Sequence, residues 1–214
     1  ALSLGSKTFY QYLDLFNLGK ETGVDYTGEA LGMLMPQSSV RNCDLARIGF
    51  GQTVALTPLQ LACAVGAAVN GGYYYTPHLV KRIYATDGSV EQKIEKSLKN
   101  RTVSEKASRT LSAMLEGVIS EGSGKKAYIE GYKVGGKTGT AQKYENGHIS
   151  QGKYVSSFVG FFPSDKPQYL ALVIVDEPQG AYYGSVVAAP CAQAIFQGII
   201  NLKDIQPYES IEKE

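Results

Sequence analysis

The sequence lacks an excess of charge of either sign. It has 21 basic and 20 acidic residues, and its formal net charge is +1. Proteins that bind nucleic acid or an acidic membrane surface by electrostatics carry a clustered basic excess. We therefore expect no nucleic-acid partner. With hydrophobic residues at 43% of 214, the chain still has enough apolar material for a sizeable core.

Long hydrophobic runs are also missing. No apolar run in the sequence approaches the roughly 20 residues that a membrane-spanning helix needs. The first residues, Ala1–Gly5, are too few for a signal peptide and have no basic start. We expect neither feature within this chain, and we detect no internal repeat or low-complexity segment.

Cysteine is scarce. The three cysteines, Cys43, Cys63 and Cys191, show no paired spacing. An odd count argues against a complete disulfide framework. Cys63 and Cys191 fall within apolar helical patterns, so we expect both to be buried thiols.

Five segments have the pattern of helices: residues 3–18, 42–48, 57–69, 104–120 and 188–202. Thr57 followed by Pro58 is a typical helix start. In the fourth helix we expect Leu111, Met114, Leu115 and Val118 to point inward. Alternation across 79–95 with a central Asp87-Gly88 predicts a β-hairpin. Residues 204–214 are charged and predicted to be frayed.

Three further segments predict an antiparallel meander. The first contains Lys137, and the others span 153–162 and 169–176. An Asn146-Gly147 turn and a proline-containing turn over 163–167 separate them. Together with the helices they predict an α+β fold, in which helices flank an antiparallel sheet.

The segment 131–142 fits two functional motifs. Its letters satisfy the phosphate-loop pattern, Gly-x4-Gly-Lys-Thr, and the run Leu170–Glu177 resembles an acidic strand end that holds Mg²⁺. A phosphate loop needs a helix directly after it, because the helix amides hold the phosphate. The residues after Thr138 contain glycines and a turn instead. A P-loop NTPase is therefore the weakest interpretation.

The same residues suit a carboxylate-bearing peptide. Lys137 supplies a positive charge, and the hydroxyls of Thr138 and Thr140 share a face of an extended strand. Gly139 lets a ligand backbone lie flat against the strand. An exposed strand edge binds extended peptides by adding a strand.

Lys137-Thr-Gly-Thr-Ala-Gln142 resembles the third active-site motif of the class B penicillin-binding proteins, the D,D-transpeptidases. Further stretches agree with that family: Gly49-Phe-Gly-Gln52, Thr57-Pro-Leu-Gln60, Asn70-Gly-Gly72, Phe158–Pro163 and Ala188-Ala-Pro190. The resemblance covers nearly all of residues 1–203 and is close to the sporulation and cell-division members. It implies a serine β-lactamase/transpeptidase-like fold, present here as an incomplete domain.

The resemblance implies acyl transfer. In the family a serine, activated by a lysine three residues on, attacks the D-Ala-D-Ala end of a peptidoglycan stem peptide, and β-lactams acylate the same serine. By resemblance, Lys137, Thr138, Gly139 and Thr140 form the catalytic strand. The N–H of Thr140 would be half of the oxyanion hole. Phe50, Gln52 and Gln142 would line the substrate groove.

Two family motifs have no convincing counterpart. Ser123-Gly-Lys-Lys126 fits Ser-x-x-Lys by letters but lies in a glycine-rich loop, and Ser-x-Asn does not occur. By family order both belong before Ala1. We therefore expect residues 1–203 to be the C-terminal part of a transpeptidase domain that cannot be acylated alone. The alternative is a non-catalytic domain that binds peptides or partner proteins.

The resemblance also implies a location and partners. The parent protein would lie on the outer face of the bacterial cell membrane, held by an N-terminal anchor outside this chain. Its partners would be stem peptides, β-lactams, its own N-terminal part and membrane proteins of cell-wall synthesis. A role in division, elongation or sporulation is not distinguished by these motifs.

The family implies no cofactor. A zinc site formed by Cys43, Asp44 and His148 is a weaker hypothesis. These side chains are acceptable zinc ligands, and the loops that carry them are expected to border the groove. Their positions in the sequence match no zinc motif.

Overall fold

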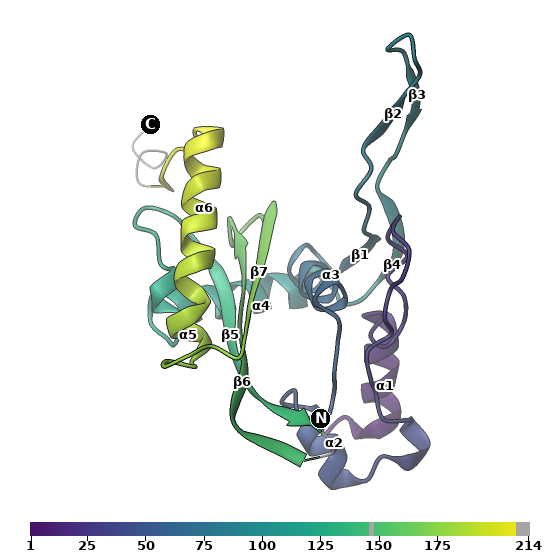
Figure 1. Ribbon diagram of the computed structural model, residues 1–214, viewed down its shortest axis with the longest axis vertical. Coiled ribbons are helices and arrows are strands. Elements are labelled where there is room, and N and C mark those ends of the chain that lie inside the picture. The colour runs from purple at the N-terminus through teal and green to yellow at the C-terminus, as the bar shows by residue number, and fades with distance from the viewer. Residues whose placement is uncertain (146–147, 209–214) are drawn as a thin grey trace. The chain divides into compact units, whose positions relative to one another are not determined.

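The computed structural model describes residues 1–145 and 148–208 and contains two compact units, Ala1–Glu105 and Lys106–Glu214 (Figure 1). Both combine helices with small antiparallel sheets, which is the predicted α+β class. The prediction that 1–203 form one incomplete domain stays a prediction.

The helices of the first unit are α1 (Gly5–Leu15), α2 (Asn42–Ile48) and α3 (Pro58–Val69), with a short 3-10 turn at Gln37–Ser39. Helix α3 begins as predicted. The Thr57 hydroxyl accepts the N–H of Gln60 at 3.1 Å, and the Gln60 side chain accepts the N–H of Thr57 at 3.1 Å. Gln60 is buried, and its amide also donates to the carbonyls of Lys20 and Leu31. This residue therefore joins the start of α3 to two loops.

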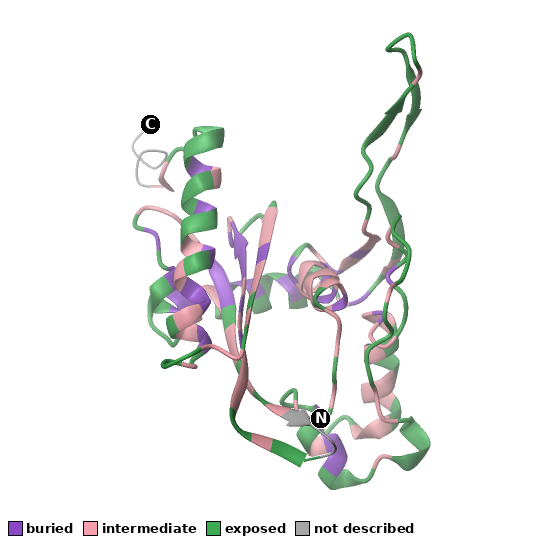
Figure 2. Ribbon diagram, in the orientation of Figure 1, coloured by how far each residue is buried: buried purple, intermediate pink, exposed green. Residues whose placement is uncertain are grey.

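Four strands of the first unit form two ribbons. Strand β1 (Tyr73–Thr76) pairs with β4 (Ser97–Arg101), and β2 (Arg82–Tyr84) pairs with β3 (Val90–Lys93), both antiparallel. The predicted hairpin turn is present: Gly88 has a φ of +85° and Asp87 accepts the N–H of Ser89. The β2–β3 ribbon continues beyond β1 and β4 as an arm that is exposed along its length (Figures 1 and 2).

The second unit contains the predicted meander. Strands β5 (Gly135–Glu145), β6 (His148–Phe162) and β7 (Tyr169–Asp176) are antiparallel in the order β5-β6-β7. Its helices are α4 (Glu105–Ser120), α5 (Gly184–Val187) and α6 (Ala189–Lys203), with a 3-10 turn at Lys125–Ala127. The predicted Asn146-Gly147 turn lies outside the described residues.

The core of the second unit lies between α6 and the sheet. Phe158 and Phe162 of β6 and Phe196 of α6 are each at most 1% exposed. The stretch Gly184–Lys203 is long and apolar enough to cross a membrane by length and composition, which the sequence did not lead us to expect. Because its Phe196 side packs on the sheet, it serves as a core helix here (Figure 2).

The prediction for helix α4 is correct only in part, because Leu115 and Val118 are half-buried whereas Leu111 and Met114 are not. Leu111 and Met114 are 37% and 66% exposed, whereas Ser108, Ser112 and Ile119 are buried. The buried residues recur at the spacing of one helical face. Leu115 lies on this face as well, so the hydrophobic pattern identified only part of the buried side of α4.

The cysteines are all free, but their burial differs from expectation. Cys63 is half-buried, whereas Cys191 is exposed on α6. Cys191 and the buried Ala192 are consecutive on the helix and so point in different directions. Apolar residues occur all round α6. The sequence pattern therefore did not show which side of the helix is buried.

The start of the predicted frayed tail is ordered. The Tyr132 hydroxyl donates to the carbonyl of Ile205 at 2.9 Å, and the Tyr208 hydroxyl donates to Asp165 at 2.5 Å. The ammonium of Lys133 lies 4.4 Å from the Tyr208 ring centroid. These contacts hold residues 204–208 against the second unit, and 209–214 lie outside the described residues.

Candidate active-site strand

Strand β5 is an edge of its sheet. It pairs with β6 on one side, and no strand in the described part of the chain pairs with the other side. The carbonyl of Thr138 accepts the Lys137 ammonium at 3.0 Å, so it points away from β6. In an antiparallel edge strand, alternate residues direct both backbone groups outward. The N–H and C=O of Thr140 therefore lie on the same open edge.

The predicted site residues divide between the two faces of β5. Thr138 and Thr140 share one face, as predicted, with Phe158 and Ser156 directly opposite on β6. Lys137 and Gly139 lie on the other face. The Lys137 ammonium reaches the open edge at the carbonyl of Thr138, whereas the threonine hydroxyls lie on the opposite face of the strand.

Both threonine hydroxyls have neighbours. The Thr140 hydroxyl accepts the N–H of Gly184 at 3.1 Å, and the Thr138 hydroxyl lies 3.5 Å from that of Ser123. Gly184 opens α5, and Ser123 lies in the turn after α4. These contacts fix two loops beside β5, while the backbone edge stays available to a ligand.

The glycines before Lys137 are set by packing. A Cβ on Gly135 would lie 2.3 Å from the ring of Phe161, and one on Gly136 would lie 2.6 Å from the ring of Phe158. Both glycines are in extended strand, and β5 continues without a helix to Glu145. The phosphate-loop interpretation is therefore wrong: no helix follows Thr138, and the pattern glycine Gly136 accommodates an aromatic ring of the neighbouring strand.

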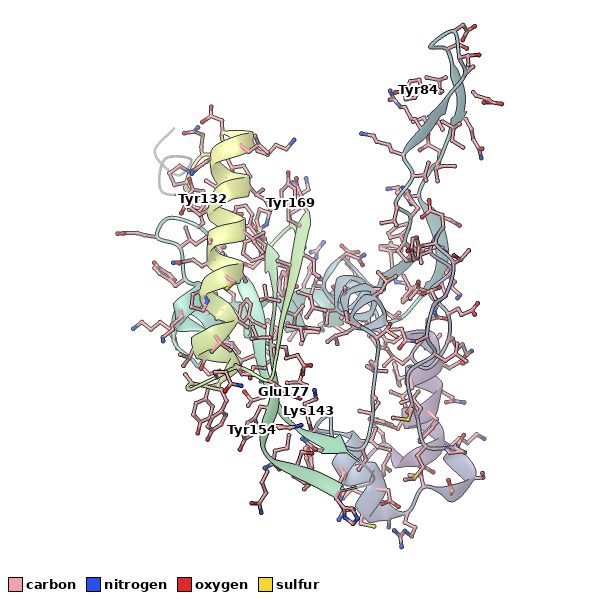
Figure 3. All side chains as sticks on the ribbon, viewed as in Figure 1. Tyr84, Tyr132, Lys143, Tyr154, Tyr169 and Glu177 are labelled. Carbon is pink, nitrogen blue, oxygen red and sulfur yellow. The ribbon has the colours of Figure 1, made fainter. Side chains whose placement is uncertain are left out.

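The acidic end of β7 is neutralised by a lysine. The Lys143 ammonium lies 2.8 Å from the Glu177 carboxylate and 3.0 Å from that of Asp176 (Figure 3). Hydrogen bonds, from Glu177 first and then Asp176, raise the pKa of Lys143 to about 12. These carboxylates, which the NTPase interpretation assigned to Mg²⁺, join β5 to the end of β7.

Three tyrosines form a shelf beside β5 that the sequence did not reveal. The rings of Tyr154 and Tyr182 stack at 4.2 Å between centroids, and those of Tyr182 and Tyr183 lie 4.5 Å apart. The Ser156 hydroxyl donates to the carbonyl of Tyr182. We call these three residues the tyrosine shelf. A Tyr-Tyr-Gly sequence between the last strand and the last helix was the only available signal.

The hydroxyls of the shelf also interact. Tyr182 donates to Tyr183 at 3.2 Å, and this hydrogen bond is the main reason why the pKa of Tyr182 is raised. The phenol of Tyr182 is therefore neutral around pH 7. Tyr154 lies directly opposite Gln142 on β5, so the shelf continues the face that carries the two threonines.

The remaining predicted groove residues have different settings. Gln142 is exposed on β5. In the first unit, Phe50 is 71% exposed, and the N–H of Gln52 donates to the carbonyl of Arg47 at 2.9 Å in the turn after α2. The proposed role of Phe50 and Gln52 in lining a groove stays a prediction.

The Ser123–Lys126 motif does not have the setting of a nucleophile. Ser123 and Lys126 are exposed in the turn and 3-10 segment after α4, not at the start of a buried helix. This placement agrees with the interpretation that the match is coincidental.

The metal hypothesis gains no support. Asp44 is buried and caps α2, where its carboxylate accepts both the backbone N–H and the side chain of Arg41. The Arg41 guanidinium lowers the pKa of Asp44. Cys43 is exposed in the first unit and His148 starts β6 in the second. Across 1–145 and 148–208, no three His, Cys, Asp or Glu side chains are grouped to hold a metal ion.

Comparison with known proteins identifies the family of the chain. Residues 1–197 match the family described as penicillin binding protein transpeptidase domain. Stage V sporulation protein D of Bacillus subtilis is 39% identical over 214 residues, which cover 99% of this chain and 33% of that protein. FtsI of Escherichia coli, named peptidoglycan D,D-transpeptidase, is 32% identical over 97% of this chain and 34% of that protein.

Solved structures show the same fold. Penicillin binding protein 3 of Mycobacterium tuberculosis in its apo form has a TM-score of 0.85 and 29% identity, covering 96% of this chain and 49% of that one. The same protein complexed with ampicillin gives a TM-score of 0.84 and 28% identity, again over 96% of this chain and 49% of that one. The chain thus spans about a third of its curated relatives. It belongs to the penicillin-binding protein transpeptidase domain family.

Proposed function

We propose that this chain is the substrate-binding, C-terminal part of a serine D,D-transpeptidase that cross-links peptidoglycan. One observation carries the proposal: the open edge of β5 presents the backbone of Thr140 together with the ammonium of Lys137. This edge suits an extended peptide that ends in a carboxylate. Family membership supplies the reaction class.

The reaction proceeds in two balanced steps. A serine oxygen attacks the carbonyl carbon of the penultimate D-Ala; its proton passes to the leaving nitrogen, and the terminal D-Ala departs as a free amine. An amine of a neighbouring stem then attacks the ester, which forms a new amide and returns the proton to the serine. With a β-lactam, the ring amide opens and the ester remains.

Residues of this chain act on the substrate side of these steps. The outward N–H of Thr140 donates to the carbonyl oxygen as it becomes an oxyanion, the type of contact worth about 10²–10³ in rate. Lys137 attracts the terminal carboxylate from one side of the edge. Gly139 leaves the strand surface bare, and Gln142 lies further along the strand.

The serine and its activating lysine are supplied by the protein before Ala1 in this proposal. The parent protein acts on the outer face of the cell membrane, held by an N-terminal anchor, where stem peptides and β-lactams are accessible. Its own N-terminal part and membrane proteins of cell-wall synthesis are its proposed partners. The sequence resemblance and the family of the chain support this placement.

The test compares this chain with the protein encoded together with its upstream region. The longer protein should form a stoichiometric adduct with fluorescent penicillin, and the 214-residue chain should form none. Lys137→Ala in the longer protein should slow labelling about 100-fold. Lys166→Ala, at an exposed lysine of the turn after β6, should leave the rate unchanged.

A second measurement separates the enzyme from a non-catalytic binding domain. ¹⁵N-labelled chain is titrated with a pentapeptide that ends in D-Ala-D-Ala, and the Thr140 amide is followed by NMR. Shifts at β5 without penicillin labelling of the longer protein would identify a peptide-binding pseudoenzyme. An unresponsive Thr140 amide together with no labelling would exclude both functions.

A further inference from the structure

We propose a second binding site in this chain: the free edge of β2 binds an extended, acidic segment of a partner protein as an added strand. The site lies on the arm formed by β2 and β3, in the first unit (Figure 1). The proposal does not rest on transpeptidase activity. It assigns a binding role to the Asp87-Gly88 hairpin, which the proposed reaction does not use.

Among residues 1–145 and 148–208, no strand pairs with the side of β2 that faces away from β3. The bonds from Ile94 N–H to the Lys81 carbonyl (3.1 Å) and from Ala85 N–H to the Ser89 carbonyl (2.9 Å) mark positions that pair with β3. Between these two positions, residues whose backbone pairs with β3 alternate with residues whose backbone does not, and the register shifts after Ile83. Arg82 and Tyr84 therefore direct their N–H and C=O groups away from β3. A free edge of this kind is a template for strand addition.

Side chains along the same edge line a groove of about 440 Å³: Leu79, Val80, Lys81, Arg82 and Tyr84. Its three apolar members are well exposed, Leu79 at 72%, Tyr84 at 55% and Val80 at 39%. Tyr84 lies on the arm, as Figure 3 shows. Ile83 adds a fourth exposed apolar side chain at 42%. Neighbouring apolar side chains on a surface mark interaction sites.

The charge of the edge selects the partner. Lys81 and Arg82 are consecutive, so the two faces of β2 each carry one cation. The carboxylate of Glu95 attracts Arg82 weakly and is bound by Lys93 at 2.5 Å. Glu91 lies on β3. An incoming strand that places two acidic residues beside Lys81 and Arg82, with apolar residues beyond them, complements this edge.

The start of the edge is held in place. The Asp25 carboxylate accepts the N–H of Leu79 at 2.6 Å and that of Val80 at 2.8 Å. These two donors are therefore unavailable to an added strand, which limits pairing to the part of β2 beyond them. The same contacts orient the groove before a partner arrives, which lowers the ordering cost of binding.

A second copy of the chain is a poorer occupant. Pairing two β2 strands would bring two copies of Lys81 and Arg82 close together, and like charges on adjacent strands destabilise a sheet. An acidic segment of another protein meets no such repulsion.

The test uses a peptide with one tryptophan, because this protein has none. The probe is acetyl-Thr-Trp-Val-Glu-Glu-Val-Thr-amide, and its fluorescence anisotropy is followed as the protein is added. Binding should be saturable and should weaken about tenfold or more with Arg82→Glu. Lys7→Glu, the same charge change at an exposed residue of α1, should bind like the native chain.

Two further peptides make the result independent of the folding of any variant. Lysines in place of both glutamates should abolish binding, and N-methylation of alternate backbone amides should weaken it about tenfold because paired donors are lost. Equal binding of the N-methylated peptide, or no binding of the acidic probe, would overturn the proposal. So would sedimentation that shows self-association abolished by Arg82→Glu, since a second copy would then be the occupant.

Discussion

Gly184 and Thr140 are 44 residues apart in sequence, and the amide of the first donates to the hydroxyl of the second at 3.1 Å. A Cβ on Gly184 would lie 2.3 Å from the carbonyl oxygen of Ser157 and 2.4 Å from that of Gly139. The loop after β7 can therefore approach β5 only because residue 184 has no side chain.

We expect Gly184→Ala to destabilise the second unit by about 1–3 kcal/mol, because a methyl group there must displace backbone. Denaturant unfolding of the chain measures this cost. Gly198→Ala is the matched control: a Cβ at Gly198 in α6 meets nothing within 4 Å. That change should stabilise by about 0.5–1 kcal/mol, since alanine is the better helix residue. Equal effects at the two positions would contradict the close contact.

We expect Gly135→Ala to cost about 1–3 kcal/mol through its contact with the ring of Phe161. The cost should fall when Phe161→Leu is present, with a coupling of about 0.5–3 kcal/mol in a double-mutant cycle. Phe196→Leu offers the comparison, since that ring is not among the atoms nearest to a Gly135 Cβ. If the free-energy effects of Gly135→Ala and Phe161→Leu simply add, the ring of Phe161 does not require a glycine at position 135.

The ion pairs of Lys143 predict a pH dependence at high pH. Its pKa is about 12 in the folded chain against an ordinary 10.5. A raised folded pKa gives stabilisation that is complete below pH 10.5 and is lost as the pH rises toward 12. The difference in unfolding free energy between native and Lys143→Met should therefore shrink over that interval.

Lys166→Met serves as the control for this titration, because Lys166 is exposed in a turn. Comparing variants is necessary because Tyr74 also has a pKa raised to about 12 by burial. A difference between native and Lys143→Met that stays constant from pH 10 to 12 would rule out the proposed linkage.

The carboxylate of Asp25 predicts a loss of stability at low pH, whereas Lys143 predicts one at high pH. Hydrogen bonds from the N–H groups of Leu79 and Val80 lower its pKa below the ordinary 3.8. A lowered folded pKa stabilises the base of the arm above the unfolded pKa, and this stabilisation is lost as the pH falls through the folded value. The amide proton shifts of Leu79 and Val80 should titrate with a midpoint below 3.8, and Asp25→Ala should remove that titration. A midpoint at or above 3.8 would show that the two hydrogen bonds do not lower the pKa of Asp25.

Local signals predicted much of the fold. Thr57 caps the helix that begins at Pro58, and Asp87 with Gly88 forms the hairpin turn, both as expected, because the interactions involved span only a few residues. The meander followed from short β-rich segments and their turns. The Lys137–Thr140 strand was placed correctly because its glycines and the following turn exclude a helix.

Contacts between distant residues were not predictable from local patterns. The tyrosine shelf depends on Ser156 holding Tyr182 across 26 residues. The burial of Ser108 and Ser112 on α4 was not predictable either, because these side chains carry no hydrophobic signal. Alternation along a strand predicts that Lys137 and Thr138 lie on opposite faces of β5. Which residues of β6 each face lies beside became known only from the register of the two strands.

The contact between Gly135 and Phe161 has an evolutionary consequence. The two positions occupy one shared volume, so natural variants should change them together. Chains that replace the aromatic ring with a smaller side chain are released from the demand for glycine at 135. Such chains would still match the phosphate-loop letters, because the fixed glycines of that pattern are Gly131 and Gly136 and residue 135 is one of its variable positions.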